Sequence, residues 1–234
     1  MEKRKILVVS PHADDSEFGM GGTIIKHLES GDYVHISLVL AVKADFLHLK
    51  GNYVSGGARV EEFVKVIDAY RPYGEITYDI WLTDERNNYG FQVDGHLDMI
   101  PLYDLVNYFD GLLREYQPNI LYFPGRSVHQ DHRQVFEAMM TSCRATCQFL
   151  PDEIYLYELP TYCWNTPERA FMPNTFVVID PEKKMQVVLA HTSQQRPEDV
   201  SLHHNALIKW NEKRGIETQA KYAEAFMLLR RKIK

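Results

Sequence analysis

Short aliphatic runs that end abruptly alternate with stretches of helical periodicity through the first two thirds of the chain. Residues 6–9 are aliphatic and mostly β-branched, which suits a strand covered on both faces, and Pro11 cannot extend the hydrogen-bond ladder of that strand. The pattern predicts strands at 5–10, 34–40, 78–82, 119–123, 154–159 and 175–179, and helices at 19–30, 181–190 and 197–214 with others between the early strands.

This alternation of strands and helices predicts an α/β fold, a Rossmann-like and mostly parallel sheet with helices on both faces. No linker, repeat or low-complexity stretch divides the 234 residues, and a hydrophobic content of 45% is enough for a large core. A single domain spanning residues 1–234 is therefore expected. The turn after the first strand holds histidine and aspartate in place of a glycine fingerprint, so no nucleotide cofactor is expected.

Histidines and carboxylates follow two of the predicted strands at the point where each strand ends. They are His12, Asp14, Asp15 and Glu17 after the first strand, and His129, Asp131 and His132 after the strand at 119–123. Ligands of open α/β sheets bind outside the carboxyl ends of the strands. Any one of these residues alone is better explained as a solvated acid or a hydrogen-bonded histidine. Their joint placement indicates a metal site, because imidazole and carboxylate suit Zn²⁺ and a catalytic zinc usually has three protein ligands.

The same residues resemble a known family. PHADDSEFGMGGTI, residues 11–24, resembles the first motif of the LmbE-like (PIG-L) metal-dependent N-deacetylases, and HQDH, residues 129–132, resembles the second. Residues 59–62, 191–194 and 222–226 resemble further motifs, so the resemblance covers nearly the whole chain. Ala13 and Gln130 each stand where the family usually has proline, and alanine at the first of these positions is similar to the bacillithiol-pathway branch.

The resemblance implies a role for each residue of the cluster. It implies that His12, Asp15 and His132 bind the metal. It implies that Asp14 is the general base, and that His129 stabilises the oxyanion and protonates the leaving amine. Chemistry supports this division, because an activated water needs a carboxylate to take its proton and the developing negative oxygen needs a donor.

For two acidic residues of the cluster, a structural role is the alternative to a functional one. Asp131 is expected to fix the tautomer of His129 and raise its pKa, and the alternative is a helix N-cap. Glu17 is a motif residue in the resemblance, but it is equally an acid in a first helical turn, so no catalytic role is expected of it.

Candidate substrate-binding residues lie near the same rim. Arg59 can make fixed-fork hydrogen bonds to sugar hydroxyls or to an acid on the ligand, the alternative being a surface salt bridge with Glu62. Asp84 and Arg86 follow the predicted strand at 78–82 and are expected near the ligand. His191 lies in a family-like motif and is expected to line the acyl pocket.

These observations lead to one hypothesis about function. The chain is expected to be a zinc-dependent hydrolase that removes an N-acetyl group from an amino sugar or a conjugate containing N-acetylglucosamine. Fe²⁺ is the alternative metal, since ligand type permits either ion. The alternative functions are a deacylase of another small N-acyl metabolite, a facial-triad Fe(II) oxygenase, and a non-catalytic sugar-binding protein. The alternation of strands and helices argues against the oxygenase, and the intact base and ligands argue against the binding protein.

Composition limits the expected partners and the expected location of the protein. The formal net charge of −6 gives no basic bias towards nucleic acid, and no apolar run approaches a membrane span. Three cysteines without metal spacing, in a chain that begins with a charged segment and has no secretory signal, favour reduced thiols and a cytoplasmic location. A small-molecule N-acetylated sugar is the expected partner. A homo-oligomer is left open.

Overall fold

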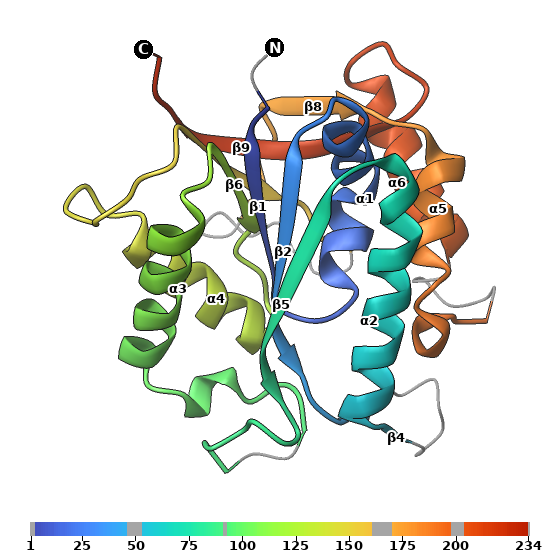
Figure 1. Cartoon of the computed structure of the whole chain (residues 1–234). Helices are drawn as coiled ribbons and strands as arrows, with labels where there is room; N and C mark the ends of the chain where they lie inside the picture. The colour runs from blue at the N-terminus through green and yellow to red at the C-terminus, as the bar shows by residue number, and fades with distance from the viewer. Residues whose placement is uncertain (1–2, 46–52, 91–92, 161–169, 198–203, 234) are drawn as a thin grey trace.

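The computed structural model describes residues 3–45, 53–90, 93–160, 170–197 and 204–233, which form a seven-stranded sheet with helices on both faces (Figure 1). The strands of this sheet are β1 (Lys5–Ser10), β2 (Tyr33–Ala41), β5 (Ile76–Thr83), β6 (Ile120–Pro124), β7 (Glu153–Tyr157), β8 (Thr175–Val178) and β9 (Ala223–Arg231). A separate two-stranded sheet pairs β3 (Ala44–Asp45) with β4 (Tyr53–Val54). The helices are α1 (Asp15–Glu29), α2 (Gly56–Tyr70), α3 (Leu102–Tyr116), α4 (Gln130–Ser142), α5 (Pro181–Val188) and α6 (His204–Ile216), with 3₁₀ turns at Arg71–Tyr73, Leu97–Met99 and Thr192–Gln194.

The strand order is β5-β2-β1-β6-β7-β9-β8, and the first five strands are parallel. This confirms the predicted fold class. The sequence pattern predicts no strand at β9, which runs antiparallel between β7 and β8. Its residues, AEAFMLLRR, are mostly strong helix formers, so only the two flanking strands make this segment a strand. The first helix also begins earlier than predicted, at Asp15, inside the polar cluster.

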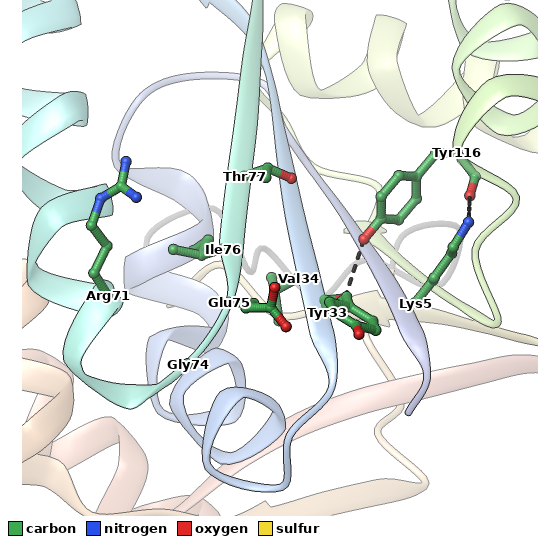
Figure 2. A pocket seen from close by; sticks show the side chains of 9 residues that line it. All are labelled: Lys5, Tyr33, Val34, Arg71, Gly74, Glu75, Ile76, Thr77 and Tyr116. Atoms are coloured by element: carbon green, nitrogen blue, oxygen red, sulfur yellow. Dashed lines mark hydrogen bonds between the residues drawn. The ribbon is translucent and has the colours of Figure 1, made fainter. Parts of the chain in front are cut away.

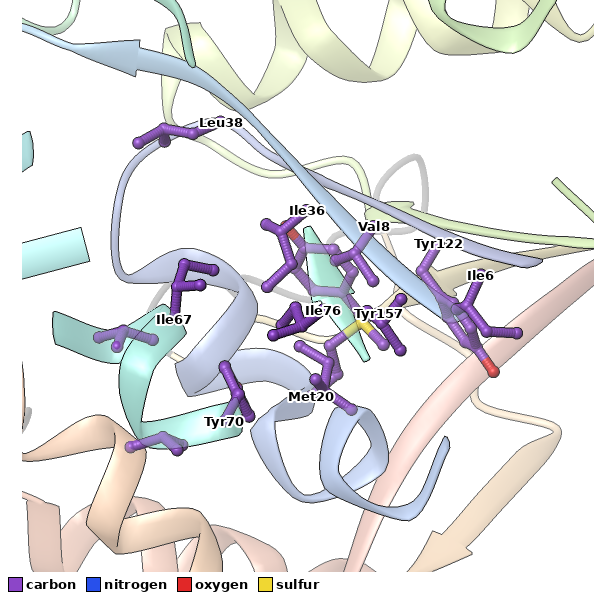
Figure 3. Packing of buried hydrophobic residues seen from close by; sticks show 14 of the residues in the cluster. Ile6, Val8, Met20, Ile36, Leu38, Ile67, Tyr70, Ile76, Tyr122 and Tyr157 are labelled. Carbon is purple, nitrogen blue, oxygen red and sulfur yellow. The ribbon is translucent and has the colours of Figure 1, made fainter. Parts of the chain in front are cut away.

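The core follows from the alternation of side chains along each strand. In β1, Ile6 and Val8 point to one face and Leu7 and Val9 to the other, and all four are fully buried. The first face packs against α1, α2 and Tyr70, and Figure 3 shows this cluster. The second face packs against α3 and α4. Full burial of each aliphatic side chain stabilises the fold by about 1.5–3 kcal/mol.

The strand order places a topological switch point between β1 and β6. From β1 the chain adds β2 and then β5 on one side, and it later adds β6 and then β7 on the other side. Crevices for ligands form at the carboxyl ends of strands where the order reverses in this way. The loops after β1 and β6, which carry the two polar motifs, therefore meet at one place.

Helix α1 is broken at Met20, whose φ of −147° is not helical. Residues 22 and 23 begin the second part of the helix. Their backbone N–H groups donate hydrogen bonds to the Glu224 carboxylate of β9, at 3.0 and 2.7 Å. Lys184 of α5 donates to the carbonyl of Phe18 at 2.9 Å and forms an ion pair with Glu224 at 2.8 Å. Both charged side chains are buried, and together they satisfy the backbone groups that the break exposes.

Two further expectations concern the chain as a whole. Among the described helices, none is long and apolar enough to cross a membrane. Cys143 and Cys147 are free thiols, and burial raises the pKa of Cys143 to about 12. The third cysteine, Cys163, lies outside the described residues.

The buried ion pair gives a stability prediction with a matched control on the same helix. Lys184→Met should lower the free energy of unfolding by about 3–5 kcal/mol, because it leaves the Glu224 carboxylate buried without its cation. Lys183→Met removes an exposed ion pair with Glu29 and should leave the unfolding midpoint unchanged. Denaturant unfolding of both variants is the measurement. Equal losses in the two variants would contradict the role given to Lys184.

Candidate metal centre and active site

The turn after β1 is held by its own side chains. The Ser10 hydroxyl donates to the carbonyl of His12 at 2.6 Å and accepts the backbone N–H of Ser16 at 3.1 Å. The Asp15 carboxylate accepts the backbone N–H of His12 at 3.0 Å. These bonds turn the chain sharply at the end of the strand, so that the side chains of His12 and Asp15 converge.

Three ligand-type atoms lie at the corners of a small triangle. His12 Nδ1 is 3.2 Å from His132 Nε2 and 3.3 Å from Asp15 Oδ2, and the last two atoms are 3.0 Å apart. A tetrahedral zinc ion with bonds of about 2.0–2.2 Å holds its ligand atoms roughly 3.3 Å apart. The three side chains are also nearly or completely removed from solvent. The donor set therefore fits a zinc-sized ion.

Asp131 orients the imidazole of His12. His12 Nε2 lies 2.8 Å from Asp131 Oδ2, and the same carboxylate accepts the backbone N–H groups of Gly95 at 2.7 Å and Leu97 at 2.8 Å. Burial alone would lower the pKa of His12, but its hydrogen bonds to Asp131 and Asp15 outweigh burial and raise the pKa to about 10. A site that favours a proton this strongly also favours a cation in its place.

The structure corrects the expected partnership between Asp131 and His129. The ring that Asp131 orients is that of His12, 119 positions earlier in the chain. The charge of Asp131 does raise the pKa of His129, as predicted, but burial and the neighbouring imidazoles outweigh it and lower the pKa to about 4. The N-cap alternative for Asp131 is also wrong, because the N-cap of α4 is His129.

His129 has a defined tautomer in this position. Its Nδ1 accepts the backbone N–H of Asp131 at 3.2 Å, so a neutral ring carries its proton on Nε2. His129 also belongs to a group of three histidines, with His12 and His132, whose ligand atoms lie within 4.8 Å of one another. Because Nε2 carries the proton, His129 is suited to donate a hydrogen bond rather than to bind a cation.

Asp14 is the N-cap residue of α1, yet its side chain makes no capping hydrogen bond within the described residues. Its carboxylate is partly buried. Burial and the charge of Asp15 raise its pKa above the ordinary value, although His191 and Arg59 oppose this shift. A carboxylate with a raised pKa and no capping bond is a suitable proton acceptor.

His191 and Glu17 form a buried pair behind this carboxylate. His191 Nε2 lies 3.2 Å from Glu17 Oε2, and the other Glu17 oxygen accepts the Ser16 hydroxyl at 2.8 Å. Both members of the pair are almost fully buried. Contact of His191 with an acyl group stays a prediction.

Arg59 is buried at the start of α2 and forms an ion pair with Asp94, with Nη1 3.0 Å from Oδ2. Its Nη1 also donates to the carbonyl of Val42 at 3.1 Å. The carboxylate of Glu62, the expected alternative partner, accepts hydrogen bonds from the Thr192 hydroxyl and from residue 193 instead. Sequence reasoning missed Asp94. The only available signal was the Asp-Gly pair at 94–95, which is typical of turns.

Asp84 and Arg86 lie at the same edge of the sheet. The two oxygens of Asp84 accept the backbone N–H groups of Lys43 at 3.0 Å and Gly56 at 2.9 Å, so Asp84 fixes the start of α2. Arg86 is exposed and follows β5 in a turn. Contact of either side chain with a ligand stays a prediction.

Two surface hollows differ in their relation to the cluster. One, of about 600 Å³, lies at the amino-terminal ends of β2 and β5 and is lined by Tyr33, Glu75 and Tyr116 among others (Figure 2). That edge of the sheet is opposite to the cluster. The other, of about 700 Å³, includes Glu62 and Thr192 and lies at the same edge as the cluster. The second hollow lies at the start of α2, the helix that also carries Arg59.

The cluster lies at the switch point of a Rossmann-like sheet, where ligands of this fold class bind, and its side chains are of the kinds that could hold a metal ion. The family model for GlcNAc-PI de-N-acetylase (PIG-L) matches residues 7–143, and the chain belongs to that family, whose members are N-deacetylases. This confirms the family predicted from the motifs. The bacillithiol-pathway branch is not confirmed. No curated protein matches the chain.

Solved structures share the fold at low sequence identity. The N,N'-diacetylchitobiose deacetylase of Pyrococcus horikoshii, in complex with an inhibitor, is 23% identical over 97% of this chain and 84% of its own, with a TM-score of 0.68. A zinc-inhibited form of the teicoplanin deacetylase Orf2 is 15% identical over 96% and 97%, with a TM-score of 0.72. GalB, a 4-carboxy-2-hydroxymuconate hydratase of Pseudomonas putida KT2440, is 16% identical over 99% and 98%, with a TM-score of 0.67. The fold alone therefore does not define the reaction.

The raised pKa of His12 predicts proton release on metal binding. At pH 8 a histidine with a pKa of about 10 is protonated, and a cation that binds its Nδ1 must displace that proton. Saturating Zn²⁺ should thus release about one proton more from the wild type than from Asp131→Asn, in which the His12 pKa falls towards its ordinary value and the ring is neutral. Calorimetry in buffers of different ionisation enthalpy measures the difference. Equal release would contradict the pairing of His12 with Asp131.

Proposed function

We propose that the chain is a metal-dependent N-deacetylase that removes the acetyl group from an N-acetylated amino sugar or a conjugate containing one. The observation that carries the proposal is the triangle of His12 Nδ1, Asp15 Oδ2 and His132 Nε2. Its spacing suits a zinc-sized ion, and His12, Asp15 and His132 are the proposed ligands. Zinc is the proposed metal, with Fe²⁺ as the alternative that the same donors accept.

Residues around the triangle have different roles in the proposed hydrolysis. A bound divalent ion would lower the pKa of a water molecule and polarise the acetyl carbonyl. Asp14 takes the proton of the attacking water, since its pKa is raised and, among the described residues, its side chain makes no capping bond. The Nε2–H of His129 donates a hydrogen bond to the carbonyl oxygen as negative charge develops there.

The pKa values also indicate which residue protonates the leaving amine. His129 has a pKa of about 4, so it is neutral at pH 7 and does not serve as the acid. Protonated Asp14 delivers the proton that it took from water, the C–N bond breaks, and acetate and a free amine are the products. This assignment differs from the role that the resemblance implied for His129.

The substrate class is supported by the family and by the relatives that share the fold. The family description is that of an N-acetylglucosamine-phosphatidylinositol deacetylase, and one relative of the same fold is a chitobiose deacetylase. An alternative substrate is another small N-acyl metabolite. Arg59, Asp84, Arg86 and His191 are the proposed substrate-binding residues, around a site of which the hollow at Glu62 and Thr192 is an extension.

A substrate panel tests the proposed reaction. Free, nucleotide-linked and thiol-conjugated N-acetylated sugars, together with one N-acetylated amine that is not a sugar, are incubated with the metal-free protein and added Zn²⁺ or Fe²⁺. Released amine should appear only with metal and mainly from a sugar. Hydration of an unsaturated dicarboxylic acid is assayed in parallel, because a hydratase shares this fold. Hydration without any amine release would overturn the proposal.

Asp14→Asn tests the general base. The amide keeps the shape of the side chain but cannot accept a proton, so turnover should fall by roughly 10²–10⁴-fold. The zinc content should stay at the wild-type level, because Asp14 is outside the triangle of proposed ligands. Deacetylation at near the wild-type rate would remove Asp14 from the mechanism.

His129→Ala separates the oxyanion donor from the metal ligands. The variant should lose roughly 10²–10³-fold in kcat with little change in KM, because the donor acts mainly when charge develops. It should also keep its zinc, since Asp15 and not His129 completes the proposed ligand set. Loss of zinc from this variant would favour the group of three histidines instead.

A further inference from the structure

Gln130 is a feature of this chain that the family resemblance does not explain. It is the first residue of α4, where the second motif of the family usually has proline. Its Nε2 donates to the carbonyl of Gly95 at 2.7 Å. A proline side chain has no donor, so a chain with proline at this position cannot form this bond.

The next residue of the motif holds the other side of the same glycine. Asp131 Oδ2 accepts the backbone N–H of Gly95 at 2.7 Å, so Gln130 and Asp131 together bind both polar backbone groups of one residue. Gly95 has a φ of +85°, and a Cβ added there would lie 3.1 Å from Gln130 Nε2. Glycine is thus suited to this position both by its conformation and by the closeness of the glutamine.

Residues 94–97, which we call the rim segment, are attached at further points. Asp131 Oδ1 accepts the backbone N–H of Leu97 at 2.8 Å. At the other end, the backbone N–H of Asp94 donates to the carbonyl of Lys43 at 2.9 Å, and the Asp94 carboxylate pairs with Arg59. The rim segment therefore connects the His12–Asp131 pair with Arg59, and the charge of Arg59 in turn acts on Asp14.

We propose that Gln130 is a positioning residue that keeps the rim segment closed against Asp131, and that it thereby helps His12 to hold the metal. The proposal rests on the proposed function, because His12 must be a ligand. Its physical basis is that one buried carboxylate serves both the segment and the ring. When Gly95 and Leu97 move away, Asp131 loses two of its donors and is no longer fixed in the position that orients His12.

The size of the effect follows from the strength of one hydrogen bond. Loss of the bond from Gln130 should raise the open population of the rim segment by roughly 2–10-fold. Because only the closed segment orients His12, zinc affinity falls in proportion to the closed fraction of the metal-free protein, so the loss of affinity is at most the same factor of roughly 2–10. This is smaller than the roughly 10–100-fold loss expected when the carboxylate partner of a ligand is itself removed.

Two substitutions at Gln130 separate positioning from folding. Gln130→Ala removes the donor. Gln130→Pro also removes it but suits the helix start, because proline is favoured at the first helical position and His129 already has the extended backbone that a residue before proline prefers. Gln186→Ala on α5 is the control, since it deletes the same side-chain atoms and a 2.9 Å hydrogen bond that the Tyr73 hydroxyl donates to Gln186 Oε1.

The experiment measures amide exchange at Gly95 and Leu97 in metal-free protein, zinc affinity by chelator competition, and the melting temperature. Both Gln130 variants should exchange these two amides roughly 2–10-fold faster and bind zinc more weakly by at most that factor, with Gln130→Pro melting like the wild type. Saturating zinc should slow the exchange of the same two amides, because zinc binds the closed state. Gln186→Ala should match the wild type in exchange and in affinity. Gln130→Pro should bind zinc no more tightly than Gln130→Ala, because neither side chain can donate the hydrogen bond to Gly95 that closes the segment.

Three outcomes would overturn the inference. Unchanged exchange in both Gln130 variants would show that the bond does not hold the rim segment. Exchange at Gly95 and Leu97 that saturating zinc does not slow would show that the segment and the metal site are independent. A wild-type protein that binds no zinc or Fe²⁺ would overturn the proposed function first, and the coupling with it, whatever the exchange rates are.

Discussion

A buried hydrogen bond between His12 and Asp131 joins the two loops on which the candidate site is built. Both side chains are buried, so water cannot replace this hydrogen bond. Leaving one partner unpaired would lower the free energy of unfolding by about 1–3 kcal/mol or more. The bond can form because β1 and β6 are parallel neighbours whose carboxyl ends meet at the switch point. The order of the strands thus determines where the His12 ring lies, and the bond to Asp131 determines which nitrogen faces Asp15 and His132.

The break in α1 helps to position Asp15 in the candidate site. Asp15 belongs to the short first part of the helix, while the second part packs in the core. Lys184 and Glu224 satisfy the backbone groups at the break, so the two parts can differ in direction without leaving buried donors unpaired. A buried ion pair contributes little net stability compared with apolar packing, and its role here is to hold a position.

Electrostatics then give different tasks to residues of similar chemistry. Asp14 and Asp15 are adjacent, but their surroundings differ. Asp15 faces two imidazoles, whereas Asp14 has a raised pKa and makes no capping bond within the described part of the chain. His12 and His129 also differ, because carboxylates raise the pKa of the first while burial and neighbouring rings lower that of the second. A proton acceptor, a neutral donor and a cation site can therefore lie within one small cluster.

The sequence by itself determined the parallel strands and the location of the site, because buried strands have a continuous aliphatic pattern and the polar motifs directly follow two of them. The resemblance of its motifs to a family also singled out His12, Asp15 and His132, whose atoms converge in the structure. Only the tertiary structure decided that β9 is a strand, that Asp131 orients His12 instead of the nearby His129, and that Asp94 pairs with Arg59. The physical reason is that local patterns report contacts within one element, whereas these pairings join segments that only the folded sheet brings together.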